Sequence, residues 1–160
     1  MSNCIKIIVW LIFISYLLVL VNVIILKDGT ALTLAKYRTQ VSLLHKIEGT
    51  NIIPLVNTII PYLGGKPSIH IAMQNLLGNI FAFSPLGLLL PLLFIKCKKI
   101  KNIFIISTGV SLIIELVQVI FSLGSGDIDD LILNVLGSLL GFGVYCFLVR
   151  FTQRTVEREH

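Results

Sequence analysis

Charged residues are scarce in this sequence. They make up 13% of its 160 residues, whereas about one quarter of the residues in soluble domains are charged. Hydrophobic residues account for 56%, and the mean hydropathy is +0.95. These values exclude a soluble globular protein. The net charge of +5 does not indicate a nucleic-acid partner, because the basic residues lie between apolar runs, where they act as topology signals.

Motifs for metal binding and for common catalytic chemistry are also missing. The three cysteines, Cys4, Cys97 and Cys146, form no CxxC pair and have no metal-ligand spacing. The sequence contains no phosphate-binding loop, no nucleophile elbow and no Ser/His/Asp pattern. We therefore expect no cofactor, and we interpret the cysteines as small apolar side chains.

Long apolar runs dominate the chain. A helix that spans a membrane needs about 20 apolar residues, and four runs approach or exceed that length: Ile7–Leu26, Ile69–Ile95, Ile103–Leu123 and Leu131–Val149. The first run is too long for the apolar core of a signal peptide, which has about 7–15 residues. The sequence therefore predicts an all-α fold, an integral membrane bundle of four transmembrane helices in a single domain over residues 1–160.

The segment Lys27–Lys66, between the first two runs, is mixed in composition. Apolar side chains recur in it at helical spacing, at Leu34, Tyr37, Val41 and Leu44. That spacing is typical of a helix lying on the membrane surface, and a helix packed against the bundle is an equal alternative. We expect an interfacial segment at the outer surface.

The distribution of lysine and arginine predicts the orientation in the membrane. Four lysines lie within Lys96–Lys101, and three arginines follow the last run, whereas Gly124–Asp130 has no basic residue. Because positive charge favours the cytoplasmic side, both termini are predicted inside and Gly124–Asp130 outside. This places Lys27–Lys66 outside despite its five basic residues, since the short Lys96–Lys101 loop is the stronger signal.

The predicted topology brings polar residues of three helices into one leaflet. These candidate binding residues are Asn75 and Asn79 on the second helix, Glu115 and Gln118 on the third, and Asp127, Asp129, Asp130 and Asn134 at the start of the fourth. With a rise of ~1.5 Å per residue, Asn79 and Glu115 lie roughly 12–14 Å below the outer ends of their helices. The similar depths predict one polar cluster inside the bilayer.

Glu115 and the aspartates each have more than one interpretation. A carboxyl group deep in a membrane is costly, so Glu115 is either a ligand, proton carrier or general base, or a structural residue hydrogen-bonded to Asn79 or Asn134. Asp130 occupies a predicted helix N-cap. Asp127 and Asp129 could bind a cationic ligand group or a hard metal such as Mg²⁺ or Ca²⁺.

Several of these motifs, in this order, resemble the VanZ-like family, which is named for a teicoplanin-resistance protein. They are Asn51-Ile-Ile-Pro-Leu, Asn75-x-x-Gly-Asn79, Phe83-x-Pro85-x-Gly87, Glu115-x-x-Gln118 and Asp127-Ile-Asp-Asp-Leu-Ile-Leu-Asn134-x-x-Gly137. The similarity covers about residues 51–141. It implies a small integral membrane protein linked to resistance against lipoglycopeptide antibiotics, with the eight candidate residues as its motif positions. One departure is Gly124, where many members carry a basic residue.

We therefore expect a multi-pass protein of the bacterial cytoplasmic membrane. Its predicted function is resistance of the teicoplanin type, through a polar pocket at the outer leaflet that binds a lipid, a lipid-linked cell-wall precursor or the drug. Two alternatives remain open. One is an intramembrane enzyme with Glu115 as acid/base and the aspartates at a head group or metal, and the other is a small proton-coupled carrier.

Overall fold

The computed structural model describes residues 3–25, 69–121, 123 and 126–158, and its secondary-structure elements are all helices. They are α1 (Asn3–Ile25), α5 (Ile69–Leu93), the short 3-10 helix η1 (Ile95–Lys98), α6 (Ile100–Ile120) and α7 (Ile128–Arg158). The four α-helices are long and apolar enough to cross a membrane. The prediction of an all-α chain with four membrane helices is therefore confirmed.

The helix ends differ from the predicted ones by a few residues, with one larger exception. α5 ends two residues early because η1 begins at Ile95, and α6 begins at Ile100 rather than at Ile103. The larger exception is α7, which continues beyond Val149, the end of the last apolar run, as far as Arg158. There Thr152 and Thr155 donate hydrogen bonds of 2.9 and 3.1 Å to carbonyls one turn earlier. The predicted interfacial segment Lys27–Lys66 lies outside the described residues.

Helices α5 and α7 are packed together through glycine. A Cβ atom built on Gly137 would lie 2.3 Å from the carbonyl oxygen of Ile80, and one on Gly141 would lie 1.8 Å from that of Ser84. Contacts this short mean that the two backbones touch, which is how small residues join membrane helices. Both pairs are 57 positions apart in the sequence. Residue numbers therefore increase together along the two helices, which run parallel.

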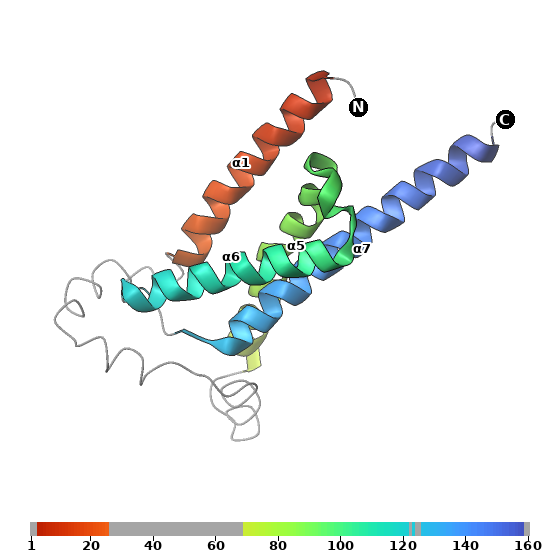
Figure 1. Cartoon of the computed structure of the whole chain (residues 1–160). Helices are drawn as coiled ribbons and strands as arrows, with labels where there is room; N and C mark the ends of the chain where they lie inside the picture. The colour runs from red at the N-terminus through yellow and green to blue at the C-terminus, as the bar shows by residue number, and fades with distance from the viewer. Residues whose placement is uncertain (1–2, 26–68, 122, 124–125, 159–160) are drawn as a thin grey trace.

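Helix α1 lies against α5 in the opposite direction. The hydroxyl of Tyr16 donates a 2.8 Å hydrogen bond to the carbonyl of Ala82, and nearer the start of α1 the Trp10 ring meets Phe94 edge-on at 5.5 Å. Figure 1 shows the result for the whole bundle: both chain ends and η1 lie at one end, and the start of α5, the end of α6 and the start of α7 lie at the other. This second end carries the predicted polar residues.

Candidate functional site

The candidate site begins at the first turn of α7. Asp127 directly precedes the helix, and its Oδ1 accepts a 2.9 Å hydrogen bond from the backbone N–H of Asp129. A side-chain oxygen that accepts from the second N–H of a helix is an N-cap. Asp127 is therefore the cap of α7, and the prediction that Asp130 caps the helix is wrong. The cap lies three residues earlier because the helix itself begins at Ile128.

Glu115 of α6 is joined to the same turn. Its side chain is 8% exposed, and Oε2 accepts a 3.0 Å hydrogen bond from the backbone N–H of Asp127. In a capping box this N–H would be bonded by an acidic side chain in the first turn of the same helix. Here the acceptor comes from a neighbouring helix, so Glu115 ties the last part of α6 to the start of α7.

Asp130 forms the third link, between α7 and α5. Its Oδ1 accepts a hydrogen bond from the side-chain amide of Asn79, which is 5% exposed. The sequence suggested, as a structural alternative, that Glu115 is hydrogen-bonded to Asn79 or Asn134. The two side-chain amides donate elsewhere instead: Asn79 to Asp130, and Asn134 to Ser111. The N-cap at Asp127 places Asp130 one turn into the helix, where it faces α5 rather than the solvent-exposed end.

A line of buried polar side chains continues below this turn. The Asn134 amide donates to the Ser111 hydroxyl at 2.9 Å, and the Ser138 hydroxyl lies 3.3 Å from the carbonyl of Phe83. Asn134 is 1% exposed, and its Oδ1 accepts no hydrogen bond within the described part of the chain. Helices α5, α6 and α7 thus share one polar seam through an otherwise apolar core.

The structure brings together most of the eight predicted residues. Five are buried (Asn79, Glu115, Gln118, Asp129 and Asn134), Asp127 and Asp130 are half-buried, and all seven lie at the end where α5, α6 and α7 meet. Asn75 differs, because its side chain is exposed on α5. Ser111 and Ser138 also belong to this group, although they are not among the eight candidate residues. Their signal was their spacing, since each lies four residues from a predicted site residue on its own helix.

The arrangement does not support a metal centre. Among the residues that the structure describes, no group of three or more histidine, cysteine, aspartate or glutamate side chains could hold a metal ion. The aspartates also have separate tasks: Asp127 caps α7, and Asp130 accepts from Asn79.

Comparison with known proteins agrees with this arrangement of motifs. The model of one protein family, VanZ/LLP1, matches residues 13–150. The chain belongs to the VanZ/LLP1 family. Among curated proteins it is similar to Protein VanZ of Enterococcus faecium, with 35% identity over 72 residues. That alignment covers 45% of this chain and 44% of the relative, so less than half of either protein is matched. No solved structure matches.

The family match includes all the residues of the polar seam. It begins within α1 at Phe13 and ends in α7 at Arg150. The eight positions suggested by resemblance to VanZ-like sequences are thus inside the matched range, and seven of them lie at one end of the fold. Membership in the VanZ/LLP1 family and four membrane helices together establish a multi-pass membrane protein.

Proposed function

We propose that this protein lowers the susceptibility of a bacterial cell to teicoplanin-type lipoglycopeptides. It does so from the cytoplasmic membrane, through the polar end of the bundle, which faces the outer leaflet. The observation that carries the proposal is the joining of three helices at one turn, by Glu115 with the Asp127 backbone and by Asn79 with Asp130. The relationship to Protein VanZ of Enterococcus faecium supports the antibiotic class.

The chemistry of this end favours a ligand rich in hydrogen-bond donors. An ionised carboxylate can only accept hydrogen bonds, and an amide adds a carbonyl oxygen that also accepts. Four carboxyl groups lie at this end, one near the end of α6 (Glu115) and three at the start of α7 (Asp127, Asp129 and Asp130). Sugar hydroxyls and peptide N–H groups, which occur in lipid-linked wall precursors and in glycopeptide drugs, complement such a surface. Binding fits better than acid/base catalysis because Glu115 is fixed by a backbone N–H.

The experiment is expression of the chain in a teicoplanin-susceptible Gram-positive host. We expect the inhibitory concentration of teicoplanin to rise, with a smaller change for vancomycin, which carries no lipid tail. Glu115→Gln keeps the shape and an oxygen acceptor for the Asp127 N–H but removes the carboxylate. We expect this variant to reach normal abundance in the membrane and to lose the resistance.

A matched control is Thr152→Val, which preserves side-chain shape at an exposed position at the other end of α7. This variant should keep the parental resistance. Full resistance from Glu115→Gln at parental abundance would remove the functional role of this carboxylate. If expression of the parent protein leaves the inhibitory concentration of teicoplanin unchanged, the proposed function itself is overturned.

A further inference from the structure

The opposite end of the bundle carries a concentration of positive charge. The helix packing shows at which end of the bundle the basic residues lie. Ile80 lies beside Gly137 and Ser84 beside Gly141, both at an offset of 57 residues. Because α5 and α7 run parallel, the residues that follow Leu93, the last residue of α5, lie toward the same end of the bundle as the last turns of α7 (Figure 1). The lysines that follow α5 and the arginines of α7 therefore lie at one end, near one membrane surface.

Helix α1 adds a further cation at the same level. Trp10 meets Phe94 edge-on, and Lys6 lies one turn closer to the start of α1. Tryptophan side chains prefer the boundary between membrane and water. The contact thus marks the depth of the interface, beside which Lys6 is exposed.

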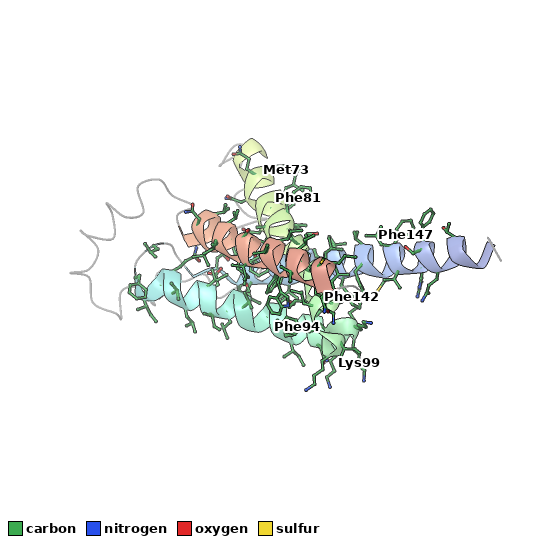
Figure 2. The ribbon with its side chains drawn as sticks, turned by 90° about the horizontal axis from the view of Figure 1, so that it is seen from above. Met73, Phe81, Phe94, Lys99, Phe142 and Phe147 are labelled. Carbon is green, nitrogen blue, oxygen red and sulfur yellow. The ribbon has the colours of Figure 1, made fainter. Side chains whose placement is uncertain are left out.

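The turn at η1 directs its lysines outward. Cys97 is 3% exposed and packs into the core, and its neighbours Lys96 and Lys98 are both exposed. The turn is held by the Cys97 N–H, which donates to the Phe94 carbonyl at 2.9 Å, and by the Asn102 amide, which donates to the carbonyl of Lys96. Figure 2 shows Lys99 pointing away from the helices at this corner.

We define the basic belt as seven exposed side chains at this end: Lys6, Lys96, Lys98, Lys99, Lys101, Arg150 and Arg154. Like charges in such number repel one another and attract phosphate groups, and clusters of four to eight basic residues beside membrane helices are typical sites for anionic lipids.

Apolar side chains beside the arginines suit the acyl part of a lipid. Figure 2 shows Phe147 on the part of α7 that extends past the other helices. Its ring stacks with that of Phe151 at 6.2 Å, and the two side chains are 67% and 62% exposed. They lie on the same face of the helix as Arg150 and Arg154, because residues three and four apart share a face. A lipid lying here meets aromatic rings along its chain and guanidinium groups at its phosphate.

We propose that the basic belt is a binding surface for anionic phospholipid, with the lipid phosphate at η1 and the α7 arginines and the acyl chains along Phe147 and Phe151. The proposal concerns the end of the bundle remote from the polar seam and does not depend on the antibiotic function. It commits to lipid rather than to a free phosphate, because the aromatic pair continues the arginine face toward the bilayer.

The test uses the full chain in nanodiscs made from phosphatidylcholine and phosphatidylglycerol in equal amounts. Because both leaflets have the same lipids, the orientation of the protein in the cell does not matter. Detergent is then added gradually, and the lipids that stay with the protein are quantified by mass spectrometry. We expect phosphatidylglycerol to be enriched over phosphatidylcholine. Inorganic phosphate added as a competitor should not displace it, and displacement by phosphate alone would overturn the assignment to lipid.

Two sets of variants make the test specific for charge. Lys98→Gln with Lys99→Gln should reduce the enrichment by about fivefold for each charge removed, and Lys98→Arg with Lys99→Arg should preserve it. Arg150→Gln with Arg154→Gln repeats the test on α7, independently of the η1 turn. Circular dichroism checks that each variant is folded. Equal retention of both lipids by the parent, or unchanged enrichment in both glutamine variants, would overturn the proposal.

Discussion

Single residues at the start of α7 decide how the helix is attached to the bundle. Asp127 caps it, and the backbone N–H of the same residue is bonded by Glu115. We predict that Asp127→Ala destabilises the protein by about 0.5–2 kcal/mol, as the loss of an N-cap does. Asp127→Asn should cost much less because asparagine is an equally good cap. Unfolding of micelle-bound protein by increasing SDS measures both, and equal losses would contradict the capping role.

Cys97 differs from Cys4 in its environment. Burial raises the pKa of the Cys97 thiol above its ordinary value, whereas Cys4 is exposed. The thiolate is the reactive form, so a higher pKa leaves less of it at neutral pH. In single-cysteine variants of the detergent-solubilised protein we expect maleimide to modify Cys97 more slowly than Cys4. The Cys97 rate should rise steeply as the pH is raised, because more of its thiol is then ionised. Equal rates of the two cysteines at neutral pH would contradict this.

Residue types in the sequence predicted which polar side chains gather at one end of the bundle, but not which hydrogen bonds they form. Seven of the eight predicted residues meet at one end because polar groups in lipid must be satisfied by one another. The sequence did not predict which pairs form. Asn79 donates to Asp130 rather than to Glu115 because α5 and α7 are in close contact, and the glycines that cause this contact fix the register. The exposure of Asn75 follows from the same register.

At the scale of elements, glycine holds α5 and α7 together. Gly141 has no room for a methyl group, since a Cβ would lie 1.8 Å from the Ser84 carbonyl oxygen. We predict that Gly141→Ala destabilises the protein by about 1–3 kcal/mol through overpacking. Gly143 is the matched control two residues away, because a Cβ there has nothing within 4 Å.

Gly143→Ala should therefore be neutral or stabilising by up to about 1 kcal/mol, because alanine favours helix over glycine. SDS-induced unfolding of the two variants compares them directly. If both changes have the same effect, the close contact of α5 and α7 is not what stabilises the bundle.

The elements themselves were predictable because the bilayer imposes their length. All four helices were expected from apolar runs, and their ends were missed by a few residues where polar side chains belong to the helix. α7 shows this best: hydropathy places its end near Val149, but Thr152 and Thr155 bond to backbone carbonyls, and the helix continues. Hydropathy identifies the part of a helix that lies in the membrane core, but it does not detect polar turns that continue the helix beyond the core.

The whole molecule has a positive and a negative end. The basic belt lies at the end with both termini, and the carboxylates of α6 and α7 lie at the other (Figure 1). We predict that the belt faces the cytoplasm. A green fluorescent protein fused after His160 should fluoresce, and alkaline phosphatase at the same point should be inactive. An active phosphatase fusion would place the carboxylates inside the cell and the basic belt outside.

The parallel pairing of α5 with α7 also sets an order of events during synthesis. The two helices meet at an offset of 57 residues. At about 5–20 residues per second, this corresponds to roughly 3–11 s of translation. Asn79 is synthesised 51 residues before Asp130, to which it donates, and Glu115 is synthesised 12 residues before Asp127, from whose N–H it accepts. We expect nascent chains stalled before α7 to remain crosslinked to the membrane insertase, and chains that include Gly141 to be released into lipid. Early release of the shorter chain would mean that α5 and α6 tolerate lipid without α7.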